Sequence, residues 1–300
     1  MLAMISALIF CIAIPFIFMA MLTRSLERSA PHYPNYRGIS VYNGLGIVWF
    51  VWLLSFWGGA HLLNIANCIQ PNWMSYLIPI FPLIAGSCIF GLFDDWVGDD
   101  NAKGFRGHIG SLVRGILTTG GIKMLSIGLL SLFTMISLYW SSTEGLVRII
   151  AGTCVIALSA NFINLFDLRP GRAGKIYSLS LPVCLVAVAF GGNVFLDWPD
   201  IVSLALAGLG PLIAVWRYDI GEKGMLGDAG ANSMGAFLGF LLATALPLWL
   251  LISWAVLMLA LNLTGEYVSF SKIIERNRIL NKLDLIGRKD DVELKEDIVE

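Results

Sequence analysis

Charged residues are scarce in this chain. Asp, Glu, Lys and Arg make up 14% of its 300 residues, whereas hydrophobic residues make up 57% and the mean hydropathy is +0.76. Soluble domains carry about 25% charged residues, so the composition excludes an ordinary soluble domain and indicates a polytopic membrane protein. The net charge of −1 says little about partners, but no part of the sequence forms the basic face that a nucleic-acid partner requires.

Residues that commonly form catalytic or metal sites are also few. The five cysteines are scattered singly, mostly inside apolar runs, and show no metal-ligand spacing. Three histidines lie too far apart in the sequence to predict a triad, and only His108 is placed near the acidic residues described below. The chain also lacks linkers, low-complexity tracts and repeats of fixed period, so we expect one membrane domain over residues 1–271.

Long apolar runs dominate what remains. A membrane-spanning helix needs about 20 apolar residues, and the sequence predicts an all-α protein with about nine such helices. The first run lacks a basic leading region and a small-residue cleavage site, so we interpret it as a span and not as a signal peptide. A stretch near 109–117 is too short and is interrupted by Arg114. The predicted spans are 2–22, 38–63, 75–93, 121–139, 146–164, 176–196, 200–217, 229–247 and 249–267.

Basic residues are distributed unevenly between the predicted loops. Almost all of them fall in loops on one side of the membrane, and only Arg148 lies near the other side. By the positive-inside rule the basic side is cytoplasmic, so the amino terminus is predicted outside and the carboxyl terminus inside. Residues 272–300 form a cytoplasmic tail whose first half has apolar residues at helical spacing, as in an amphipathic helix at a membrane surface.

Two adjacent carboxylates, Asp94 and Asp95, follow the third predicted span. Charges at the membrane edge are costly, so a pair of them suggests function. Magnesium is held by one or two carboxylates together with phosphate and water oxygens, and a carboxylate pair also permits proton transfer by one member. The alternative is a solvated acidic turn at a helix end.

Asn161, Asn164 and Asp167 recur at intervals of three residues at the inner end of the fifth span. On a helix they share nearly one face, and polar groups facing lipid would be unsatisfied, so we expect them to line a cavity. An interhelical hydrogen-bond ladder is the alternative.

Asp228 stands just before the eighth span in Gly-Asp-Ala-Gly, a segment of small residues. Glycines allow a ligand to approach the backbone closely, and free N–H groups at a helix amino terminus favour anions. Asp228 could instead simply cap that helix.

These segments, in this order on one predicted face, resemble the polyprenyl-phosphate N-acetylhexosamine-1-phosphate transferases. Asp94 and Asp95 match the aspartate pair of that family, Asn161, Asn164 and Asp167 match its Asn-x-x-Asn-x-x-Asp element, and Asp228 matches its Gly-Asp element. The resemblance covers roughly residues 35–270, and the chain is identified as a divergent member.

The resemblance implies a magnesium-dependent enzyme of the bacterial cytoplasmic membrane that transfers a sugar-1-phosphate from a UDP-sugar to undecaprenyl phosphate. Asp94, Asp95 and Lys103 would be catalytic, and Asp228 with Asn164 would hold magnesium. A homodimer is left open. The remaining residues implied in substrate binding are Asn161, Asn164, Asp167, Arg106, His108, Arg276 and Arg278.

The chain also departs from the family pattern. Leu168 and Arg169 follow Asp167 where the family usually has Gly and a further Asp-Gly, and the histidine-rich cytoplasmic motif is replaced by the segment with Arg276 and Arg278. Alternative functions are an aromatic prenyltransferase, a transporter, or a catalytically silent scaffold that binds a lipid-linked precursor. The charges gather at the membrane edge and not at the midplane, which favours interfacial chemistry over transport.

Overall fold

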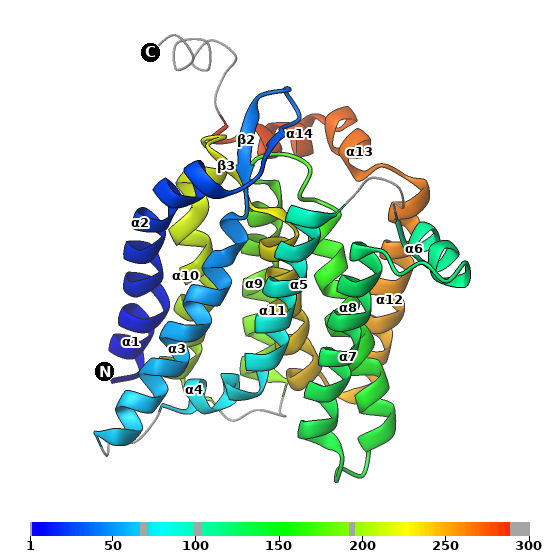
Figure 1. Ribbon diagram of the computed structural model, residues 1–300. Coiled ribbons are helices and arrows are strands. Elements are labelled where there is room, and N and C mark those ends of the chain that lie inside the picture. The colour runs from blue at the N-terminus through cyan, green and yellow to red at the C-terminus, as the bar shows by residue number, and fades with distance from the viewer. Residues whose placement is uncertain (1, 67–70, 99–103, 192–195, 289–300) are drawn as a thin grey trace.

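The computed structural model describes residues 2–66, 71–98, 104–191 and 196–288, with only some of the side chains of helix α6. Long helices run side by side through the molecule, and the first and last described helices, α1 and α14, lie at opposite ends of the bundle (Figure 1). Three of the long helical segments are composite: α1 (Leu2–Ser6) continues through the π-helical Ala7–Ala13 into α2 (Ile14–Ser29), a 3-10 turn at Leu45–Ile47 precedes α3 (Val48–Ile65), and α4 (Asn72–Leu77) is joined through Ile78–Ile80 to α5 (Phe81–Val97). The other long helices are α7 (Thr119–Tyr139), α8 (Gly145–Asn164), α9 (Arg172–Phe190), α10 (Trp198–Asp219), α11 (Gly227–Ala245) and α12 (Leu248–Tyr267). Three shorter helices, α6 (Gly104–Val113), α13 (Phe270–Arg276) and α14 (Arg278–Leu285), lie outside these segments.

The expectation of a helical membrane protein is confirmed. Among the described residues, eight helical segments are long and apolar enough to cross a membrane. Helix α11 is less apolar, because it contains Asp228, Asn232 and several glycines, and every residue from Ala229 to Ala245 is buried. A helix that touches protein on all sides can carry polar groups that lipid would not tolerate. Helix α11 lies inside the bundle and corresponds to the predicted span 229–247, although it is not one of these eight segments.

A small sheet modifies the all-α prediction. Strands β1 (His32–Pro34) and β2 (Ser40–Asn43) pair antiparallel, and β2 pairs parallel with β3 (Gly224–Met225). The predicted span 38–63 therefore begins later, at Leu45. The sheet lies at the same end of the bundle as α13 and α14 (Figure 1), and it fixes the segment before α3 against the segment before α11.

Close contact between α5 and α11 positions the acidic residues. A Cβ atom added to Gly91 would lie 2.6 Å from Ala229 Cα, so only glycine permits this approach of the two backbones. Asp94 and Asp95, one turn further along α5, thereby reach the first turn of α11. The carboxylate pair thus belongs to the last turn of α5 and not to a loop beyond the span.

Candidate functional site

A lysine joins two of the predicted acidic residues. Lys123 Nζ, in the first turn and a half of α7, lies 2.6 Å from Asp94 Oδ2 and also donates a hydrogen bond to Asp228 Oδ2. The three side chains are between 13% and 22% exposed, so each is only partly accessible to solvent. Three helices, α5, α7 and α11, thus contribute to one charge cluster whose net charge is negative, with two carboxylates around one ammonium group.

Asp95 has a structural partner. Its two carboxylate oxygens accept hydrogen bonds from the backbone N–H groups of Asp228 at 2.9 Å and Ala229 at 3.1 Å. Helix amino termini leave such N–H groups unpaired, and a carboxylate there satisfies them and interacts favourably with the helix dipole. Asp95 therefore caps α11, which leaves the side chain of Asp228 free to bind Lys123.

Gly227 leads into this cap with a φ of +71°, a left-handed conformation that favours glycine. A Cβ atom at Gly227 would lie 2.4 Å from Asn43 Oδ1 and 2.5 Å from Asp95 Oδ2. The two oxygens therefore flank the same backbone position. Asn43 is 8% exposed and its Oδ1 has no hydrogen-bond partner among the described residues. The surroundings of Gly227 therefore contain a buried oxygen that can still accept a hydrogen bond or bind a cation.

A cavity of about 360 Å³ begins at Asn43, Asp95 and Asp228 and extends between the sheet and the ends of α8, α10 and α11. Asp167, in the turn after α8, lines it together with Asp95 and Asp228. Burial raises the pKa of Asp167 well above the ordinary carboxyl value, and the nearby negative charges of Asp219 and Asp95 raise it further. Repulsion among close carboxylates favours a protonated member or a bound cation.

Aromatic and basic side chains also line the cavity or lie beside it. The guanidinium of Arg169 lies over the Tyr36 ring, 4.3 Å from its centroid, and forms an ion pair of 2.8 Å with Glu275. Glu222, which has a φ of 56°, accepts a hydrogen bond from Asn35 Nδ2 at 2.9 Å and pairs with Arg37 at 3.3 Å. Tyr36 and Arg169 thus offer a planar, cationic surface in the same cavity as the acidic side chains of Asp95, Asp167 and Asp228.

The structure separates the three residues of the asparagine motif. Asn161 Nδ2 donates a 2.6 Å hydrogen bond to Asn262 Oδ1 of α12, as the interhelical alternative predicts. Asn164 is the last residue of α8, and its carbonyl accepts a hydrogen bond from the N–H of Asp167. Asp167 lines the cavity of about 360 Å³, whereas Asn161 and Asn164 are not among its lining residues.

The predicted basic and histidine residues have varied locations. Lys103 lies outside the described residues, and Arg106 and His108 belong to α6, at positions whose side chains are not described. Arg276 ends α13 and Arg278 begins α14, and both are exposed. Lys123 is the lysine that contacts Asp94, and it was not among the residues predicted from the sequence. Its signal was available, since Lys123 is the one charged residue of α7, and a charge within a span marks a functional site by default.

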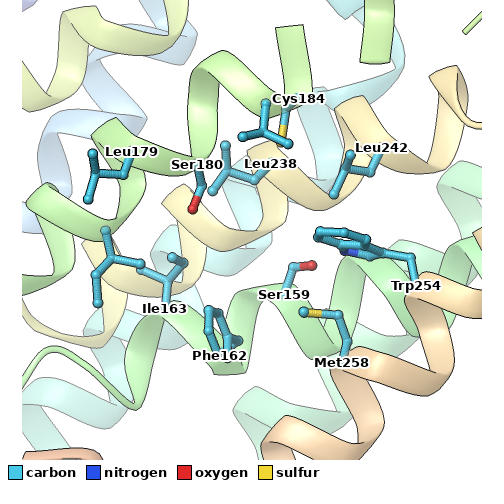
Figure 2. A pocket seen from close by; sticks show the side chains of 12 residues that line it. Ser159, Phe162, Ile163, Leu179, Ser180, Cys184, Leu238, Leu242, Trp254 and Met258 are labelled. Carbon is cyan, nitrogen blue, oxygen red and sulfur yellow. The ribbon is translucent and has the colours of Figure 1, made fainter. Parts of the chain in front are cut away.

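A second cavity, of about 230 Å³, lies between α8, α9, α11 and α12 (Figure 2). Its lining is apolar except for Ser159 and Ser180 and the indole of Trp254, whose Nε1 lacks a described partner. Because none of its lining residues is charged, this cavity offers room for hydrocarbon and no groups for phosphate chemistry.

Metal ligands are sparse. Across the described ranges, no three Asp, Glu, His or Cys side chains gather closely enough to hold a metal ion by themselves. Magnesium does not require such a set, because it is usually bound through one or two carboxylates and completed by phosphate and water. The unpartnered Asn43 Oδ1 beside Asp95 is an oxygen of the kind that magnesium binds.

No protein-family model matches the sequence, and no curated protein matches it.

Proposed function

We propose that this chain is a magnesium-dependent phosphoglycosyl transferase that moves a sugar-1-phosphate, of the N-acetylhexosamine type, from a UDP-sugar to undecaprenyl phosphate and releases UMP. The observation that carries the proposal is the Asp94–Lys123–Asp228 cluster, which opens beside an acidic cavity at the ends of apolar helices. A lipid phosphate stays at the membrane edge while its chain remains in hydrocarbon, so its reaction partner must be bound there.

The proposed site faces the cytoplasm of a bacterial cytoplasmic membrane, and the product serves the synthesis of envelope polysaccharide or peptidoglycan. Support comes from the basic loops, which are predicted on the same side of the membrane as Asp94, Asp167 and Asp228. Counting α11, the proposed topology crosses the membrane nine times, which agrees with α1 and α14 lying at opposite ends of the bundle (Figure 1).

The chain's own residues can perform the transfer in the following way. An oxygen of the lipid phosphate attacks the phosphorus that carries the sugar, the bond from that phosphorus to the UMP oxygen breaks, and UMP leaves. Asp94 accepts the proton of a protonated lipid phosphate, and the ammonium of Lys123 binds phosphate oxygens as negative charge develops. Fixed charges placed at the reacting group supply much of the rate in phosphoryl transfer.

Substrate and metal would bind around this core. Asp228 and Asn43 would hold magnesium, which neutralises the pyrophosphate when bound; Asn43 thus takes the place expected for Asn164, because its oxygen faces the cluster. Tyr36 and Arg169 form a flat cationic surface suited to the nucleotide. Asp167, enclosed on the same cavity, would accept a hydrogen bond from the nucleotide or the sugar.

A transfer assay tests the proposal. Purified protein with magnesium, undecaprenyl phosphate and radiolabelled UDP-GlcNAc or UDP-MurNAc-pentapeptide should form labelled lipid and an equal amount of UMP. Asp94→Asn should abolish both products, whereas Glu144→Gln, at the opposite end of the bundle, should leave them unchanged. If a panel of nucleotide sugars yields neither labelled lipid nor UMP, the enzyme proposal is wrong.

A silent binding scaffold for a lipid-linked precursor is the second candidate. Two observations favour it. Both carboxylate oxygens of Asp95 are bound to backbone N–H groups of α11, and Arg169 lies in the segment where members of the similar family usually have Gly-Asp-Gly. The two functions differ in one result. A scaffold would bind undecaprenyl phosphate or a UDP-sugar in equilibrium dialysis and release no UMP.

A further inference from the structure

Helix α14 has one polar face that is buried and one apolar face that is exposed. Asp284, 6% exposed, accepts hydrogen bonds from Arg172 at 2.9 and 2.8 Å and forms an ion pair with Arg288 at 2.7 Å. On the other face, Ile279 is 72% and Leu283 is 49% exposed. A soluble helix normally buries its apolar face and exposes its charges, so the orientation of α14 is inverted.

The position of α14 explains this orientation. Its anchor, Arg172, is the first residue of the span α9, and Lys175, one turn into α9, donates a hydrogen bond to the carbonyl of Asp284. One further turn along α9, Leu179 is 71% exposed, as a lipid-facing residue should be. Helix α14 thus lies at the level where α9 enters the membrane, and hydrocarbon is the medium available to its apolar face.

Exposed basic side chains accompany this apolar face. Arg276, Arg278 and Lys282 are all exposed on α13 and α14. Each basic residue near an anionic leaflet strengthens the attraction roughly fivefold. An apolar face with cationic residues beside it is the pattern of a helix that lies in the plane of a membrane surface.

We propose that α13 and α14 form an interfacial anchor that binds the anionic phospholipids of the membrane leaflet on this side, with Ile279 and Leu283 inserted among the acyl chains. The charges of Arg276, Arg278 and Lys282 contact the headgroups. The anchor acts whether or not the chain is an enzyme, because it depends only on the membrane position of α9.

The anchor is connected to the wall of the acidic cavity. Arg288 donates a hydrogen bond to the carbonyl of Pro170 at 3.1 Å, and Glu275 holds Arg169 at 2.8 Å. Both contacts fix the segment between α8 and α9 that carries the cavity lining residues Leu168, Arg169 and Pro170. Membrane contact by the tail therefore stabilises the placement of Arg169.

Spin-label accessibility in lipid nanodiscs tests the anchor. Labels are placed at Leu283→Cys on the apolar face and at Lys282→Cys one residue away, in a chain whose Cys68 and Cys154 are replaced by Ser. Leu179→Cys, on the exposed side of α9, is the reference for hydrocarbon. Nanodiscs contain phosphatidylcholine alone or mixed with phosphatidylglycerol, and collisions with oxygen and with a water-soluble nickel complex are measured.

The expected result has two parts. With phosphatidylglycerol, the Leu283 label should collide with nickel at least about threefold less often than the Lys282 label, and with oxygen as often as the Leu179 label. Replacing Arg276, Arg278 and Lys282 together by Gln should raise nickel collisions at Leu283 in these nanodiscs. The matched control, Arg24→Gln with Arg28→Gln on α2, removes two exposed charges elsewhere and should change nothing at Leu283.

Three outcomes would overturn the proposal. Equal nickel collisions at Leu283 and Lys282 would place the apolar face in water. A short distance between Leu283 labels in two chains, measured by dipolar spectroscopy, would assign the face to a second copy. Protection of Leu283 that is the same with and without phosphatidylglycerol would remove the role of the anionic headgroups. Because no readout is enzymatic, failure of the transferase assay would leave this test unaffected.

Discussion

The carboxylate of Asp95 accepts a 2.9 Å hydrogen bond from the backbone N–H of Asp228, 133 residues further along the chain. This contact gives the adjacent members of the acidic pair different roles. Asp95 stabilises the start of α11, and Asp94 is paired with Lys123 beside the cavity. Variants of the two residues should therefore differ in which property they impair.

Asp95→Ala should lower the thermal stability of the protein, because loss of an amino-terminal cap costs about 1–2 kcal/mol. Asp94→Ala should leave stability nearly unchanged and abolish transfer. Unfolding of the two variants in one detergent, followed by circular dichroism, compares them directly. Equal melting temperatures would contradict the capping role of Asp95.

Lys123→Met should reduce activity by at least about 100-fold, the typical effect of removing one preorganised electrostatic group. The same change leaves Asp94 and Asp228 without their common counter-ion, so the melting temperature should fall as well. Lys123→Arg retains the charge and is the control, and it should recover most of the stability. A fully active Lys123→Met protein would exclude the proposed role of the ammonium group.

Asp167 should make stability depend on pH. Its pKa is raised in the folded state, so between the ordinary carboxyl pKa and the raised value the folded chain binds more protons than the unfolded chain. Stability is then highest below this interval and falls as pH rises through it. Asp167→Asn should flatten the decline, which melting temperatures measured over a pH series would detect. A decline of unchanged slope in Asp167→Asn would assign it to other groups.

Asn43→Ala should raise the magnesium concentration needed for half-maximal transfer by about tenfold, an effect at the lower end of that seen when groups supporting a metal are removed. Binding of Mn²⁺, followed by electron paramagnetic resonance without substrate turnover, gives a second readout. Asn35→Ala removes another amide from the cavity lining, one that is bound to Glu222, and serves as the control. Unchanged metal binding in Asn43→Ala would remove this residue from the site.

Asn161→Leu should lower stability only slightly, by about 0.6 kcal/mol, the average for a hydrogen bond between membrane helices. Transfer activity should stay near that of the unchanged protein, because Asn161 binds Asn262 on α12 and does not line the cavity. A large loss of activity with normal stability would show instead that Asn161 contacts substrate.

The sequence by itself determined the class of fold and the end of the bundle where acidic residues gather. Both depend on local information: the length of an apolar run predicts a span, and Asp94, Asp167 and Asp228 each stand at the end of such a run. The start of α3 was predicted too early, because hydropathy does not distinguish a short buried strand such as Ser40–Asn43 from the beginning of a span.

The tertiary structure decided which of these residues meet. Lys123 reaches Asp228 across 105 positions, and Asn43 faces Asp95 only because the sheet holds the segments before α3 and α11 together. Arg172 and Lys175 follow Asp167 closely in the sequence, but they bind Asp284 of the tail. The spacing of residues along one helix predicts which of them share a face. Their partners on other helices are decided by helix packing and by the need to pair buried charges. Helix packing and charge pairing leave no local pattern in the sequence.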